Sequence, residues 1–238
     1  MNERVVTKPK TTEFKTLEDA IWNGMIHDVI ILLLYNDKLN VTFDSNYPIR
    51  WASRNGHLEV VKLLLEDERV DPSDDNNYAI GWASYNGHLE VFKLLIKDER
   101  VDPSDRDNEA IRGASQSGHL EVVKLLLLDD RVDPSAITNH AIRLASGNGH
   151  LEVVKLLLED ERVDPSADDN FAIQWASENG YLEVVKLLIK DERVDPSAND
   201  NHAIRFALKN VHLEVVKLLI KDERVYTTLP VGVDLFVF

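Results

Sequence analysis

Residues 148–158 read Asn-Gly-His-Leu-Glu-Val-Val-Lys-Leu-Leu-Leu, and the same stretch returns along the chain with small changes. Its glycine recurs with a period of 31, at Gly56, Gly87, Gly118, Gly149 and Gly180, and the next step falls on Val211. Six units follow one another without an insertion, at 47–77, 78–108, 109–139, 140–170, 171–201 and 202–232. A fixed period of this length is typical of a solenoid of stacked repeats, with no domain boundary inside the array.

A seventh, weaker unit precedes these six. Residues 20–24 match residues 52–56 at an offset of 32, whereas residues 28–34 match residues 59–65 at an offset of 31. We therefore expect one inserted residue near Met25.

Each unit is predicted to form two helices and a loop. In the unit 78–108, the apolar spacing favours a first helix over residues 78–85, which Gly87 ends because glycine adopts the left-handed conformation of a helix C-cap. A broad apolar surface predicts a second helix from Leu89 to about Lys97. Pro103 lies in the turn-rich loop that follows. Asn108 precedes the next first helix, where asparagine suits either a left-handed turn or a helix N-cap.

The stretch Ala141–Leu158 resembles the ankyrin repeat, and seven copies make the resemblance specific. It implies an all-α solenoid over residues 17–225, with residues 1–16 as an N-terminal extension and residues 226–238 as a tail. Ankyrin repeats usually have a period of about 33. The repeats of this chain are shorter by two positions, which fall in the loop, so we expect the β-hairpins to be shortened or replaced by turns. The short variant is similar to arrays of amoebae and their giant DNA viruses, which implies such a source.

The composition limits the classes of molecule that the chain is expected to bind. The formal net charge is −15, which repels nucleic acid and anionic lipid and attracts a basic patch on another protein. Cysteine is absent, and the longest apolar run, residues 29–35, is too short to span a bilayer. We expect a soluble protein of the cytoplasm or the nucleus, most simply a monomer.

The first helices vary mainly at their first, fifth and eighth positions, which share one helical stripe. In ankyrin stacks the corresponding stripe lines the concave face, where partners dock. The candidate partner-binding residues on it are Trp22, Tyr47, Trp51, Arg54, Tyr78, Trp82, Tyr85, Gln116, His140, Phe171, Trp175, His202 and Phe206. Aromatic side chains are enriched in interface hot spots. The stripe is richest in them from Tyr47 to Tyr85, so we place the hot spot there.

Some of these residues have a second interpretation. The fifth-position aromatics Trp51, Trp82 and Trp175 suit packing beneath a neighbouring loop as well as exposure, whereas the first and eighth positions favour exposure. Leu128 and Ile137 replace polar residues of the other units, but single exposed apolar residues are common on protein surfaces.

Residues that resemble chemical sites recur in every unit. One histidine per repeat, as at His119 and His150, does not form a metal site, because stacked helices lie roughly 8–10 Å apart and zinc needs ligands about 2 Å from one ion. A calcium loop that began at Asp71 would need glycine at Asn76 and glutamate at Trp82. We expect neither a cofactor nor catalysis.

The tail, residues 226–238, is apolar and rich in strand formers. We expect it to cap the last unit, and the rival interpretation is a docking peptide or a dimer contact. The sequence thus predicts a protein-binding adaptor, and the alternative is a structural protein that self-associates through its tail.

Overall fold

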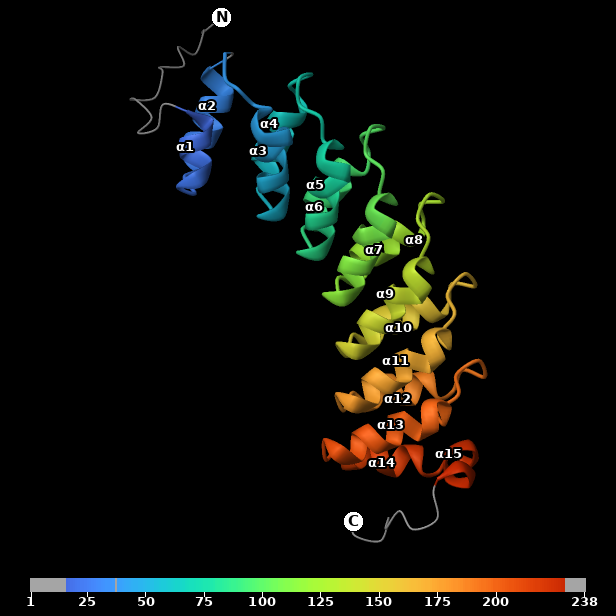
Figure 1. Cartoon of the computed structure of the whole chain (residues 1–238). Helices are drawn as coiled ribbons and strands as arrows, with labels where there is room; N and C mark the ends of the chain where they lie inside the picture. The colour runs from blue at the N-terminus through green and yellow to red at the C-terminus, as the bar shows by residue number, and fades with distance from the viewer. Residues whose placement is uncertain (1–15, 37, 230–238) are drawn as a thin grey trace, which may run out of the picture. The chain divides into compact units, whose positions relative to one another are not determined.

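The computed structural model describes residues 16–36 and 38–229, and the regular secondary structure of this part of the chain consists of fifteen helices, with no strand. The helices are α1 (Leu17–Trp22), α2 (Ile26–Tyr35), α3 (Phe43–Arg54), α4 (Leu58–Leu65), α5 (Asp74–Tyr85), α6 (Leu89–Leu95), α7 (Asp105–Gln116), α8 (Leu120–Leu127), α9 (Ala136–Gly147), α10 (Leu151–Leu158), α11 (Ala167–Glu178), α12 (Leu182–Leu188), α13 (Ala198–Lys209), α14 (Leu213–Leu219) and α15 (Glu223–Thr228). Odd-numbered helices up to α13 are the first helices of the repeats, and even-numbered ones are the second (Figure 1).

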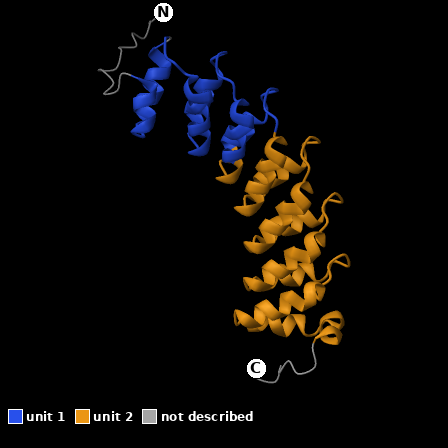
Figure 2. Cartoon of the chain, viewed as in Figure 1, with its two compact units in different colours: residues 1–83, 90–102 blue, residues 84–89, 103–238 orange. Residues whose placement is uncertain are grey.

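The helices belong to two compact units (Figure 2), one formed by residues 1–83 and 90–102 and the other by residues 84–89 and 103–238. In the second unit, α7, α9, α11 and α13 pack one on the next, and α8, α10, α12 and α14 do the same. In the first unit, α1 packs on α3 and α2 packs on α4. The predicted stacking of repeats is therefore confirmed within each unit.

The second helices supply the most regular part of the core. In α8, Val122, Val123 and Leu126 are buried, and α10 and α12 repeat the pattern. These positions, i, i+1 and i+4, lie on one face of a helix. A lysine and a glutamate three positions apart, as in Lys124 and Glu121, pair on the opposite face. The helix is thus amphipathic, and its apolar face joins neighbouring repeats.

From α3 to α13, each first helix opens with a left-handed turn, and its right-handed part follows that turn, which in α5 is at the predicted start, Tyr78. In α5 the helix includes Asp74, but Asp75, Asn76 and Asn77 all have φ of 57°. The left-handed alternative for the asparagine is therefore correct, and the N-cap alternative is not. The Asn77 side-chain oxygen accepts a hydrogen bond from the backbone N–H of Asp102, at 2.8 Å.

This asparagine contact forms a ladder with a constant step along the chain. It recurs, always to the aspartate of the following loop, in Asn46–Asp71, Asn108–Asp133, Asn139–Asp164 and Asn170–Asp195. An amide held in a fixed left-handed turn thus satisfies a backbone donor of the next repeat.

An aspartate–arginine pair organises the loop that follows each second helix from α4 to α14. Arg100 is paired with Asp98, at 2.7 Å, and also donates to the carbonyl oxygen of Val70, 2.8 Å away in the preceding repeat. The hydrogen bond from Arg100 lowers the pKa of Asp98 below its usual range. The same pairing recurs in Asp67–Arg69, Asp129–Arg131, Asp160–Arg162, Asp191–Arg193 and Asp222–Arg224. Turns held in this way stand where a longer repeat would have a hairpin.

The predicted insertion near Met25 is wrong. The backbone N–H of Met25 donates to the carbonyl oxygen of Ala20, and that of His57 donates to the carbonyl oxygen of Ala52. Met25 therefore corresponds to His57, and the offset of 32 between the first two repeats continues into α2. The carbonyl oxygen of Leu39 accepts a hydrogen bond from Arg69, just as that of Val70 accepts one from Arg100. Leu39 therefore corresponds to Val70, and the offset has become 31 by this point. The extra residue therefore lies after the middle of α2, and α2 runs on to Tyr35.

The ladder ends at Asn201, in the last repeat. Its side-chain nitrogen donates to the Thr228 hydroxyl of α15, at 2.9 Å, whereas its buried side-chain oxygen has no partner in the described part of the chain. Tyr226, which stands one ladder step after Asn201, instead donates its backbone N–H within α15. Residues 226–228 are thus helical rather than extended. Residues 230–238 of the tail lie outside the described residues, and the capping role of the tail stays a prediction.

Candidate protein-binding surface

The first helices of the first unit carry a continuous row of aromatic and cationic side chains, which we call the aromatic row: Trp22, Tyr47, Arg50, Tyr78, Trp82 and Arg54. The rings of Trp22 and Tyr47 stack with their centroids 5.0 Å apart. The rings of Tyr78 and Trp82 meet edge to face at 5.5 Å. Five of the thirteen predicted site residues are therefore brought together in one chain of contacts.

Arg50 joins the two halves of the row, and the sequence interpretation omitted it. Its guanidinium carbon lies 5.6 Å from the ring centroid of Tyr47 and 5.9 Å from that of Tyr78. It is held by Asp75, at 2.6 Å, and by the carbonyl oxygen of Ser45, at 2.9 Å. The signal that would have revealed it is the equal spacing of Arg50–Asp75 and Arg143–Asp168, which is also the step of the asparagine ladder.

The row ends in an exposed cation. Arg54 lies over the ring of Trp82, with its guanidinium carbon 4.2 Å from the centroid. An arginine above an indole face is a cation–π pair, which restrains both side chains. Trp22, at the other end of the row, is 61% exposed, so the surface presents an open aromatic face there.

The fifth-position tryptophans are half-buried, which combines the two interpretations of the sequence. The ring of Trp51 packs on His57, at 4.8 Å between centroids, rather than extending the row. Trp175 covers Gly147, where a Cβ atom would lie 2.3 Å from the indole. Both rings therefore pack within the repeat stack while keeping part of their surface accessible.

The second unit carries two smaller clusters. In one, Phe171 contacts Trp175 edge to face at 5.4 Å, and the guanidinium carbon of Arg143 lies 5.5 Å from the Phe171 centroid. In the other, His202 stacks on Phe206 at 3.9 Å, and the Lys209 ammonium lies 5.1 Å from the same ring. Each cluster repeats the aromatic–cation chemistry of the aromatic row.

The remaining predicted residues, Tyr85, Gln116 and His140, belong to the second unit. Tyr85 is 40% exposed, and its side chain lies 3.3 Å from the place that a Cβ atom on Gly113 would take. Gln116 is half-buried, and its carbonyl oxygen is contacted by His150. His140 is half-buried, and its buried Nδ1 has no partner in the described part of the chain. Burial lowers the pKa of both His140 and His202, so both imidazoles are neutral at pH 7.

Residues 16–36 and 38–229 contain no group of three histidine, aspartate or glutamate side chains that could hold a metal ion. In the same part of the chain, no helix is long and apolar enough to cross a membrane. The arrangement of rings and cations has the chemistry of interface hot spots.

A comparison with protein families identifies the repeats. A family model for ankyrin repeats, in three copies, matches residues 17–107, 49–138, 110–200 and 140–228. The chain belongs to the ankyrin repeat family. Proteins built from ankyrin repeats are generally non-catalytic modules for protein–protein interaction. A comparison with curated proteins found no match.

Proposed function

We propose that this ankyrin protein is a non-catalytic adaptor that binds a partner protein through the first helices of its repeats. The observation that carries the proposal is the aromatic row from Trp22 to Arg54, a run of ring–ring and ring–cation contacts on the first unit. Tryptophan, tyrosine and arginine are the residue types that dominate interface hot spots.

The aromatic row is ordered before any partner binds. Each ring touches a neighbour, and Asp75 fixes Arg50 between two tyrosines. A surface whose side chains are already restrained loses less conformational entropy on association. The same argument applies to the Phe171–Trp175 and His202–Phe206 clusters of the second unit, which we propose as secondary contact regions.

Charge favours a partner with a basic patch. The chain carries 42 acidic against 27 basic residues, so its long-range field is negative. Such a field speeds the encounter with a cationic protein and disfavours nucleic acid and anionic membranes. We place the adaptor in the cytoplasm or the nucleus and expect a monomer.

The test is affinity capture from the source cell with quantitative mass spectrometry, comparing the native chain with the Trp22→Ala, Tyr47→Ala variant. The expected result is loss of at least one captured protein by about tenfold, the change that follows from removing one hot-spot contact of about 1.4 kcal/mol. A Tyr226→Ala variant serves as the control, because Tyr226 is 66% exposed and lies outside the row. Unchanged capture by the double variant would reject the proposal.

A further inference from the structure

The second helix of the first repeat, α2, differs from the others on its outer face. In the register that the backbone hydrogen bonds of Met25 and His57 establish, Ile30 takes the position of Lys62 and Leu34 takes that of Glu66. The position of Ile30 is lysine in every later repeat, at Lys62, Lys93, Lys124, Lys155, Lys186 and Lys217. At the position of Ile30, α2 therefore presents an apolar side chain where every later repeat presents lysine, and at the next turn Leu34 is 53% exposed.

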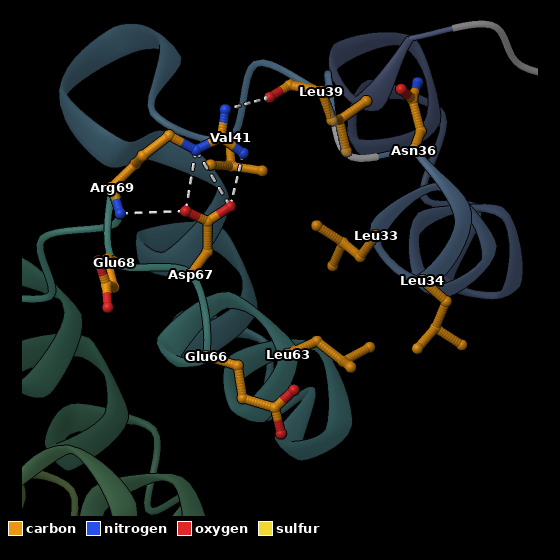
Figure 3. Close-up of a pocket in the computed structure, with 10 residues that line it drawn as sticks. All are labelled: Leu33, Leu34, Asn36, Leu39, Val41, Leu63, Glu66, Asp67, Glu68 and Arg69. Carbon is orange, nitrogen blue, oxygen red and sulfur yellow. Dashed lines mark hydrogen bonds and ion pairs between the residues drawn. The ribbon is translucent and has the colours of Figure 1, made fainter.

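A groove lies beside this apolar face. It has a volume of about 630 Å³ and lies between α2 and α4, and Asn36, Leu39, Val41 and residues 66–69 also line it. Figure 3 shows Leu33 and Leu34 of α2 and Leu63 of α4 extending toward one space. An apolar groove between two helices is a common receptor for an amphipathic helix.

The rim of the groove is acidic. Glu66 and Glu68 line it, are exposed and form no ion pair with a described residue. Asp67 and Arg69 also line the groove, and they neutralise each other in an ion pair whose nitrogen and oxygen atoms are 2.6 Å apart. The groove thus offers leucine side chains at its base and two uncompensated carboxylates at its edge, so the complementary ligand is apolar on one side and cationic on the other.

We propose that the groove between α2 and α4 binds a basic amphipathic segment of a partner protein. Apolar side chains of the segment contact Leu33, Leu34 and Leu63, and its lysines or arginines face Glu66 and Glu68. This site is separate from the aromatic row, because it lies on the second helices and the row lies on the first. A partner that contacts both surfaces would gain from their linkage.

The test uses the full chain and two labelled synthetic peptides of about four helical turns, one with leucines on one face and lysines on the other, and one with glutamates in place of the lysines. Fluorescence anisotropy measures their binding. We expect the leucine–lysine peptide to bind, the leucine–glutamate peptide not to bind, and Leu34→Lys to weaken binding at least about tenfold. A Glu66→Gln, Glu68→Gln variant should weaken binding and flatten its dependence on salt.

Two controls separate this site from general adhesion and from the aromatic row. Leu128 occupies the same helical position as Leu34 and is 80% exposed, so Leu128→Lys should leave peptide binding within about twofold. Trp22→Ala, Tyr47→Ala should also leave it unchanged. Equal effects of Leu34→Lys and Leu128→Lys, or binding of the glutamate peptide, would overturn the proposal.

Two alternative occupants of the groove, a second copy of the chain and its own N-terminal segment, would give different results in these experiments. A concentration-dependent dimer in sedimentation that Leu34→Lys abolishes would assign the groove to a second copy of the chain. Displacement of the leucine–lysine peptide by a synthetic peptide of residues 1–15, at lower concentration than the unlabelled leucine–lysine peptide requires, would assign it to the chain's own N-terminal segment. Either outcome would overturn the assignment to a partner protein.

Discussion

The imidazole Nε2 of His150 lies 2.9 Å from the backbone carbonyl oxygen of Gln116, which belongs to the preceding repeat. His119 makes the same contact with Tyr85, at 3.1 Å. The ring that makes this contact passes directly over a glycine of the preceding repeat, and a Cβ atom on Gly118 would lie 2.5 Å from the His150 Nδ1. The recurring glycine and the recurring histidine are therefore two halves of one stacking contact.

This contact predicts that Gly118→Ala strongly lowers the free energy of unfolding. Alanine at φ of +77° is strained by about 1–2 kcal/mol, and the collision with His150 adds a cost similar to that of overpacking, about 1–3 kcal/mol, for a total of about 2–5 kcal/mol. Urea denaturation followed by circular dichroism measures the loss. Gly24→Ala is the matched control, because Gly24 has φ of +68° but no atom within 4 Å of the added Cβ. Equal losses for the two variants would show that the stacking contact contributes nothing.

The sequence predicted the left-handed backbone of the repeat glycine but not its contact with the ring of the next repeat. A positive φ follows from the Asn-Gly pair that ends a helix, and all the repeat glycines from Gly24 to Gly180 have it. The approach of the next repeat's ring does not follow, because it depends on the distance between stacked units. Arg50 was missed for a similar reason, since its partner Asp75 is remote in sequence and becomes a neighbour only when repeats stack. The all-helical fold was predictable because each repeat carries the same local signals.

The exposed residue Ile137 marks a position where the repeat is locally strained. It adopts φ of 51°, which a β-branched side chain disfavours, and it follows Arg112 at the spacing that separates Arg50 from Asp75. The corresponding residues of other repeats, Asp75 and Asp168, pair with their arginines. We predict that Ile137→Asp stabilises the chain by about 1 kcal/mol, through a more tolerant backbone and an exposed ion pair with Arg112.

The thermal unfolding midpoint of Ile137→Asp is the measurement, and Thr138→Asp is its control. Thr138 also has a positive φ, of 55°, but the arginine-paired aspartates of other repeats, Asp75 and Asp168, correspond to Ile137 and not to Thr138. It should therefore show only the backbone part of the gain. If Arg112→Ala leaves the effect of Ile137→Asp unchanged, the ion pair is absent and the prediction of pairing is wrong.

Val211 replaces the repeat glycine in the last repeat. It has φ of 63° and is 67% exposed, so it bears the backbone strain without a ring of a following repeat against it in the described part of the chain. Val211→Gly should raise the free energy of unfolding by about 1 kcal/mol, measured by urea denaturation. Val211→Ala should recover much less, because alanine still resists a left-handed backbone. A loss of stability in the glycine variant would refute this explanation.

The stacking histidine also predicts how stability depends on pH. Burial lowers the pKa of His119 below its ordinary value of 6.5, so the folded state holds this imidazole neutral while the unfolded state binds a proton more readily. Where the unfolded state binds more protons, stability rises with pH. The contribution of His119 is therefore complete above about pH 6.5 and is lost as the pH falls from there toward the folded pKa.

His119→Tyr tests this directly, because Tyr181 already fills the equivalent place over Gly149. Urea midpoints between about pH 8 and pH 5 should fall less steeply for the variant than for the native chain. The slope should shrink rather than vanish, because burial also lowers the pKa of His140 and His202. The aspartates paired with arginine, such as Asp160, have lowered pKa values and lose their contribution only at more acidic pH, through and below their ordinary value of 3.8. An unchanged slope between pH 8 and pH 5 would mean that His119 is not held neutral by the stack.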